Sequence, residues 1–225
     1  MVKTLRHVEI EIDKDEVCRY LGYGKDQGPN SSISSLIDEE IEEAYDLIQP
    51  SCFYQLVDIK RVRKPRVILE DGSRITSKVL SRVLSRCYQV SIFVANIGRG
   101  LEERVAQLMK EGQMLRATIL DAIGSEVAEK TARYLQDEVQ ELANSNGAEI
   151  TLRYSPGYCD WDIKQQRVLF QAMNSAPLGV SLTEECLMVP CKSVSGIIGL
   201  GHFEKWQPRY SPCRLCNQMD CQSRR

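Results

Sequence analysis

The longest regular pattern in the chain is helical and runs from Leu101 to Leu142. Gly112 and Gly124 interrupt it, and glycine weakens the interior of a helix. We therefore expect two helices, of which the second runs from about Gln113 to Ala143. The polar stretch that follows ends in Gly147, which is typical of a helix C-terminus. Any fold for this chain has to accommodate that long second helix.

Strand patterns lie on both sides of the helical stretch, and they do not alternate with helices in a regular βαβ rhythm. The apolar run from Tyr88 to Ile97 is typical of a central strand. Further strands are predicted at residues 7–12, 53–70 (two strands), 150–153 and 186–203 (two strands). We also predict a helix at residues 33–48, whose acidic residues 38–43 we interpret as solvated surface. The pattern favours one α+β domain with an antiparallel or mixed sheet.

Composition excludes several classes of protein. The 225 residues carry a net charge of −2, which argues against a protein whose main task is to bind nucleic acid. The N-terminus lacks the apolar core of a secretion signal, and no apolar run is long enough to span a membrane. Nine cysteines, an odd number, then fit a reduced cytoplasmic protein better than a disulfide framework.

The familiar catalytic motifs are absent from the sequence. It has no P-loop, no complete G-x-G-x-x-G and no G-x-S-x-G. Gly98-Arg99-Gly100 follows a predicted strand, but we interpret it as the start of a helix. With only His7 and His202, most histidine acid–base chemistry is excluded. We expect a binding protein or accessory subunit rather than a self-sufficient enzyme.

The most unusual local segment is Arg153-Tyr154-Ser155-Pro156-Gly157-Tyr158-Cys159-Asp160-Trp161-Asp162. Arg153 offers a planar fork for a carboxylate, and Gly157 allows a ligand to approach the main chain. Tyr158 or Trp161 could stack on a heteroaromatic ring, and Asp160 and Asp162 could hold hydroxyls or an ammonium group. Asp162 could equally cap the following helix. Together the residue types suit a zwitterionic aromatic ligand, but on residue chemistry alone an ordinary Pro-Gly turn with aromatic packing is the favoured interpretation.

The R-x-x-P-G-Y segment resembles the signature of the S-adenosylmethionine-binding activation domain of cobalamin-dependent methionine synthase. Other segments agree in order along the chain, and the resemblance covers residues 90–203. They are Leu120-Asp121-Ala122-Ile123-Gly124-Ser125-Glu126, Leu182-Thr183-Glu184-Glu185 and Ser193-Val194-Ser195-Gly196. The residues after the turn, 159–162, depart from the pattern of the synthase.

The resemblance implies a bent antiparallel or mixed sheet flanked by helices. It also implies that the chain binds S-adenosylmethionine for the reductive methylation of an oxidised corrinoid. The corrinoid would be held by a partner methyltransferase or corrinoid protein, and an external donor would supply the electron. Carried over, Arg153 binds the methionyl carboxylate, while Ser155, Gly157 and Tyr158 hold the adenosyl part. Asp121 and Glu126 would lie on the helix that faces the site.

The last part of the chain adds a cysteine cluster, Cys213-x2-Cys216-x4-Cys221, that the synthase domain lacks. This spacing suits zinc or an iron–sulfur cluster, with Cys186, Cys191 or His202 as a fourth ligand, and free thiols are the alternative. We therefore divide the chain into one domain at 1–205 and a tail at 206–225. An alternative function follows, that of a metal- or iron–sulfur-binding redox accessory protein of a corrinoid system. An independent methyltransferase is disfavoured because no glycine-rich nucleotide loop is present.

Overall fold

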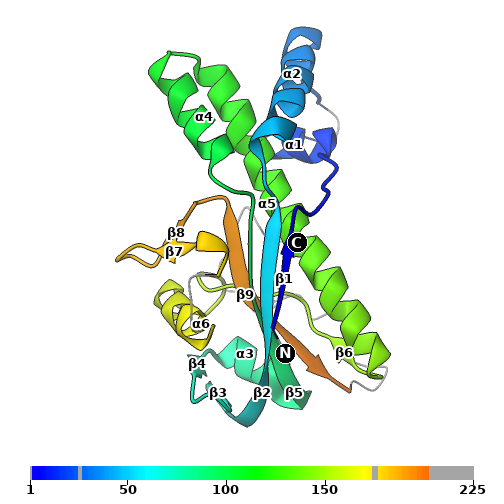
Figure 1. Ribbon diagram of the computed structural model, residues 1–225, viewed down its shortest axis with the longest axis vertical. Coiled ribbons are helices and arrows are strands. Elements are labelled where there is room, and N and C mark those ends of the chain that lie inside the picture. Colours follow the sequence, from blue (N-terminus) through cyan, green and yellow to red (C-terminus); the bar gives the residue numbers. More distant parts are fainter. Residues whose placement is uncertain (1, 25–26, 174–176, 203–225) are drawn as a thin grey trace.

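Figure 1 shows the computed structural model of the protein, which describes residues 2–24, 27–173 and 177–202. It has the predicted α+β architecture, in which one long helix crosses an antiparallel sheet. The helices and strands are β1 (Val2–Arg6), α1 (Lys14–Tyr20), α2 (Ser31–Leu47), β2 (Ser51–Arg63), β3 (Arg66–Leu69), β4 (Arg74–Thr76), α3 (Lys78–Val83), β5 (Cys87–Asn96), α4 (Gly100–Lys110), α5 (Met114–Ser145), β6 (Glu149–Ile150), α6 (Gln166–Ala172), β7 (Ser181–Leu182), β8 (Met188–Val189) and β9 (Ser193–Gly201).

The main sheet has the order β4-β3-β2-β5-β9-β6, and all its neighbours are antiparallel. β1 pairs with the first half of β2, and β3 pairs with the second half. The register between β2 and β3 shifts between Ile59 and Arg61, where a bulge lets the strand bend. Figure 1 shows the end of β2 curving away with β3 and β4. A separate two-stranded sheet joins β7 and β8.

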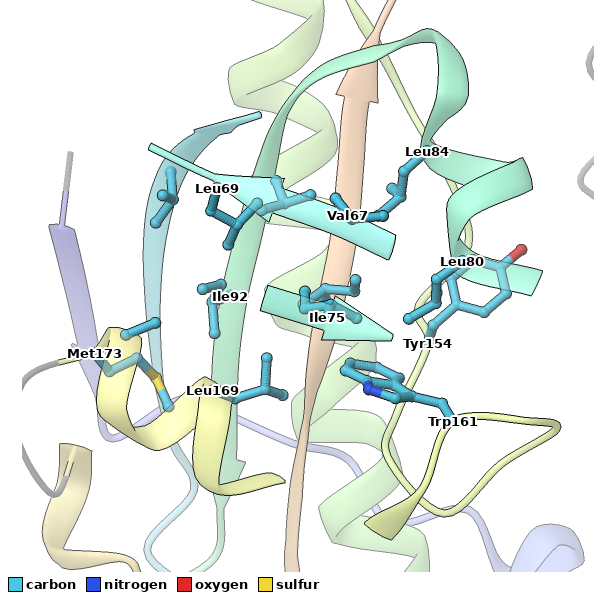
Figure 2. Packing of buried hydrophobic residues seen from close by; sticks show 14 of the residues in the cluster. Val67, Leu69, Ile75, Leu80, Leu84, Ile92, Tyr154, Trp161, Leu169 and Met173 are labelled. Atoms are coloured by element: carbon cyan, nitrogen blue, oxygen red, sulfur yellow. The ribbon is translucent and has the colours of Figure 1, made fainter. Parts of the chain in front are cut away.

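Both faces of the central strand β5 are covered, which explains its unbroken apolar sequence. Phe93 and Ala95 pack toward α5, against residues such as Leu135 and Val139. Ile92 and the other alternate residues pack on the opposite face, in the cluster drawn in Figure 2. That cluster joins β3, β4, α3 and α6 through the labelled side chains, which include Val67, Leu69, Ile75, Leu80, Leu84 and Leu169.

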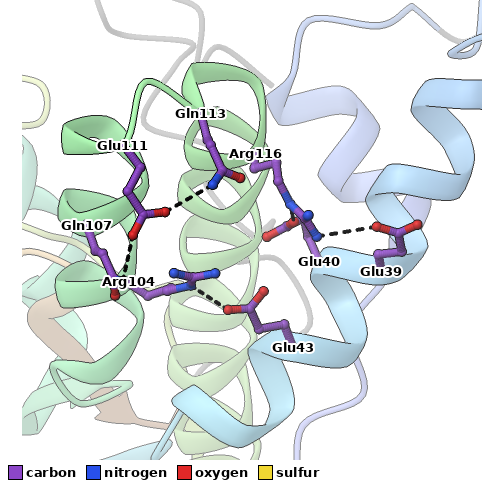
Figure 3. A network of polar contacts seen from close by, with 8 residues as sticks. All are labelled: Glu39, Glu40, Glu43, Arg104, Gln107, Glu111, Gln113 and Arg116. Carbon is purple, nitrogen blue, oxygen red and sulfur yellow. Dashed lines mark hydrogen bonds and ion pairs between the residues drawn. The ribbon is translucent and has the colours of Figure 1, made fainter.

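A third cluster joins α1, α2, α4 and α5 beyond the end of β5. Polar contacts bind α2 to the other two long helices, as Figure 3 shows. Arg104 of α4 pairs with Glu43 at 2.5 Å, and Arg116 of α5 contacts Glu39 and Glu40. The interpretation of residues 38–43 as solvated surface is therefore wrong for Glu40, which is fully buried. Arg116 donates a hydrogen bond to this carboxylate from the neighbouring helix, which offsets the cost of burying its charge.

Most predicted elements are confirmed, including the long helix, whose interior contains Gly124 without a break. The strand predicted at 7–12 is wrong, because the strand lies at Val2–Arg6 and His7 follows it with a φ of 56°. The strand predicted at 150–153 is short, since β6 ends at Ile150 and only a bridge at Tyr154 follows. Among the described residues, none of the helices is long and apolar enough to cross a membrane.

Candidate functional site

The segment that begins at Arg153 runs along the edge of β9. The backbone of Tyr154 exchanges two hydrogen bonds with Ile197, at 3.0 and 2.9 Å. A Cβ atom on Gly196 would overlap the carbonyl oxygen of Tyr154 and would approach the Phe93 ring to 3.1 Å. Glycine at position 196 is therefore what allows the segment to lie against the sheet. The S-V-S-G strand and the R-x-x-P-G-Y segment are in direct contact.

Two aromatic residues anchor the turn in the core, as Figure 2 shows. Tyr154 and Trp161 are 7% and 2% exposed and belong to the apolar cluster of β3, β4 and α6. Between them the turn closes through a 2.7 Å hydrogen bond from Gly157 N to the Trp161 carbonyl. Gly157 has a φ of 91°, which a side chain would strain. Trp161 is thus structural, and of the two proposed stacking residues only Tyr158, 57% exposed, reaches solvent.

The two aspartates of the turn accept hydrogen bonds at the starts of helices. Asp160 accepts hydrogen bonds from Ser77 Oγ at 2.6 Å, Lys78 N at 2.6 Å and Val79 N at 3.3 Å, at the start of α3. Burial works to raise the pKa of Asp160, but these hydrogen bonds outweigh it and lower the pKa below its usual value. Asp162 accepts from Lys164 N at 2.8 Å and caps a short helical turn. The capping alternative for Asp162 is therefore confirmed.

The outer side of the turn is accessible. Gly157 and Tyr158 are exposed, and Ser155 is half-buried. A hollow of about 450 Å³ lies against the turn and is lined by Gly157 and residues 159–163. Because Asp160 and Asp162 are engaged in these hydrogen bonds, the groups accessible to a ligand here are backbone atoms and the exposed side of the turn.

Arg153 points to the long helix α5. Its Nε donates to Gln136 Oε1 at 3.1 Å, and its Nη2 pairs with Glu129 Oε2 at 3.3 Å. Glu129 and Gln136 are seven residues apart and so lie on one face of the helix, two turns from each other. The Arg153 side chain is 19% exposed, so its guanidinium is held in place near the surface. Neither partner of Arg153 was singled out from the sequence.

Asp121 lies on the same face of α5, two turns before Glu129. Lys192, in the loop between β8 and β9, pairs with Asp121 at 2.8 Å and donates to Ser125 Oγ at 2.9 Å. A Cβ atom on Gly124 would approach Lys192 Cε to 3.1 Å, so this glycine leaves room for the lysine stem. Asp121 is thus neutralised by an ion pair that joins the loop to the helix.

Glu126 lies beside Lys130 rather than Arg153. It is 3% exposed, and its Oε1 has no hydrogen-bond partner among the described residues, although Lys130 lies 3.5 Å away. Burial raises the pKa of Glu126, and Glu16 and Asp13 raise it further against the opposing effect of Lys130. The structure therefore brings Arg153 to the helix of Asp121 and Glu126 but pairs it with a third carboxylate, Glu129.

The predicted metal ligands Cys213, Cys216 and Cys221 lie outside the described residues. Of the suggested fourth ligands, Cys186 accepts a hydrogen bond from Arg167 Nε at 3.0 Å, and His202 Nδ1 lies 3.0 Å from the Gly147 carbonyl. Cys191 is exposed, but partial desolvation and a hydrogen bond with Glu102 raise the pKa of its thiol to about 11. In the described part of the chain, no group of three or more histidine, cysteine, aspartate or glutamate residues could hold a metal ion.

Comparison with known proteins links these features to one family. Residues 79–217 match the family model described as vitamin B12 dependent methionine synthase, activation domain. The fold is similar to a crystal structure of the MetH reactivation domain bound to AdoHcy, with a TM-score of 0.68. The two are 14% identical, and the match covers 94% of this chain and 82% of the other. A search of curated proteins finds no match.

Proposed function

The chain belongs to the activation-domain family of vitamin B12-dependent methionine synthase, and on this premise we propose that it binds S-adenosylmethionine and presents it to an oxidised corrinoid. The corrinoid is carried by a partner methyltransferase or corrinoid protein. An external donor supplies one electron, the methyl group passes from the sulfonium to the reduced cobalt, and S-adenosylhomocysteine remains. This chain supplies binding and orientation, and the reactivity belongs to the ligand and the metal.

The observation that carries the proposal is the placement of Arg153. Its guanidinium is positioned by Gln136 on α5, next to the edge of β9 and at the start of the exposed turn. A planar guanidinium fixed in this way is suited to the carboxylate of an amino acid. The similar fold that is described as bound to AdoHcy supports a ligand of this class.

The exposed turn is suited to the adenosyl part. Gly157 has no side chain to keep a ligand away from the backbone, and Tyr158 offers an exposed ring beside it. Ser155, in the same turn, supplies further backbone polar groups. Asp121 and Glu126 remain candidate residues on α5, although Asp121 is paired with Lys192 and Glu126 is buried.

Isothermal titration calorimetry with S-adenosylmethionine tests the proposal. We expect saturable binding by the wild type and a loss of roughly tenfold or more in affinity for Arg153→Ala, since a charge-assisted pair is removed. Arg61→Ala, which removes an exposed arginine of β2 away from α5 and the turn, is the control and should bind like the wild type. Absence of binding by the folded wild type at millimolar ligand would overturn the proposed function.

A further inference from the structure

We propose that Glu129 is a specificity-determining residue that receives the α-ammonium group of the ligand. In the free protein its carboxylate occupies the position on Arg153 that the ligand carboxylate takes over. The inference rests on the proposed function and deepens it, because it specifies how the amino-acid end of the ligand is recognised.

The two partners of Arg153 differ in charge and in exposure. Gln136 is neutral and accepts from Nε, so it can orient the guanidinium whether or not a ligand is present. Glu129 is charged, lies 3.3 Å from Nη2, and is 46% exposed. Partly exposed ion pairs contribute little stability. The carboxylate of a ligand can therefore replace that of Glu129 on Arg153.

When a ligand carboxylate replaces Glu129 on Arg153, every charge keeps a partner only if the ligand is a zwitterion. A ligand carboxylate that takes Arg153 leaves Glu129 with an unpaired negative charge nearby, which repels that ligand. The α-ammonium group of an amino acid is attached next to its carboxylate and can pair with the released Glu129. The neighbouring Arg153–Glu129 pair therefore matches an α-amino acid better than a carboxylate or an amine alone.

The two other carboxylates of α5 that the sequence singled out do not fulfil the same role. Asp121 is already paired with Lys192, which also contacts Ser125. Glu126 is buried and pairs with Lys130. Among the residues that the structure describes, Glu129 is the carboxylate that combines contact with Arg153 and access to solvent.

The test uses calorimetry with three ligands: S-adenosylmethionine, its decarboxylated form, and its deaminated 2-oxo form. With Glu129→Gln we expect the amine-only ligand to bind roughly three- to tenfold more weakly, because its ammonium partner is lost. The carboxylate-only ligand should bind more tightly by a similar factor, because Arg153 is no longer contested. Arg153→Ala should have the opposite preference: it should lower the affinity for the carboxylate-only ligand more than the affinity for the amine-only ligand.

Glu138→Gln is the matched control, since it breaks another carboxylate–cation pair of α5, with Lys3 at 2.5 Å. It should leave all three affinities unchanged. If the wild type binds S-adenosylmethionine but Glu129→Gln shifts both analogues in the same direction or neither, the role of Glu129 is overturned and the proposed function stands. If the wild type binds none of the three ligands, both proposals are overturned.

Discussion

The carbonyl oxygen of Tyr154 lies so close to the α-carbon of Gly196 that no side chain fits between them. This contact joins the start of the exposed turn to β9, and Tyr154 and Ile197 close it with two hydrogen bonds. The neighbouring Phe93 ring belongs to a buried central strand and cannot move away without disturbing the sheet. The position of the turn thus depends on the absence of a side chain at Gly196 of β9.

Gly196→Ala should therefore destabilise the protein by about 2–4 kcal/mol, because the new methyl group meets backbone and a packed ring rather than a flexible side chain. Urea unfolding followed by circular dichroism measures the change. Gly28→Ala is the control, since nothing lies within 4 Å of a Cβ atom there and its backbone is not left-handed. Equal stability of Gly196→Ala and the wild type would show that the contact is not close in solution.

Asp160 connects the same turn to the start of α3. Asp160→Ala should cost about 1 kcal/mol, because it removes the hydrogen bonds that Asp160 accepts at the start of α3 but leaves Ser77 as the N-cap. The folded-state pKa of Asp160 is lowered, so its contribution is present above the unfolded-state pKa of about 3.9 and is lost as pH falls through the lower folded value. Unfolding curves of variant and wild type should therefore differ at pH 7 and converge in strong acid. A difference that persists unchanged at pH 2 would contradict this account.

The sequence was sufficient where one local pattern decided the structure. The apolar run of β5 reflects burial on both faces, and Gly147, with a φ of 67°, directly follows the end of α5 that it was expected to mark. The alternation at residues 8–12 was misleading, because Val8 and Ile12 pack into two different clusters without forming a strand. Alternating burial can arise in an irregular segment that lies against helices, where no neighbouring strand is present.

The site could be predicted only in part. The R-x-x-P-G-Y segment indicated Arg153, but its partners are 17 and 24 residues away along the chain. The helical period places Glu129 and Gln136 on one face, yet it does not say which face of α5 meets the turn. That orientation is set by packing on the sheet through residues such as Leu135 and Val139. The same packing turns Glu126 away from Arg153 and into a buried position.

Glu126 gives a prediction of opposite sign to that of Asp160. Burial raises its pKa in the folded protein, so ionisation opposes folding: stability is full below the unfolded-state pKa of about 4.3 and falls as pH rises through the higher folded value. Glu126→Gln cannot ionise and should raise the melting temperature at pH 7 by roughly 1–3 °C, with the gain disappearing near pH 4. Thermal unfolding across this pH range measures it, and Glu141→Gln on the exposed side of α5 is the control. Lower stability of Glu126→Gln at pH 7 would mean that the ion pair with Lys130 outweighs the cost of burial.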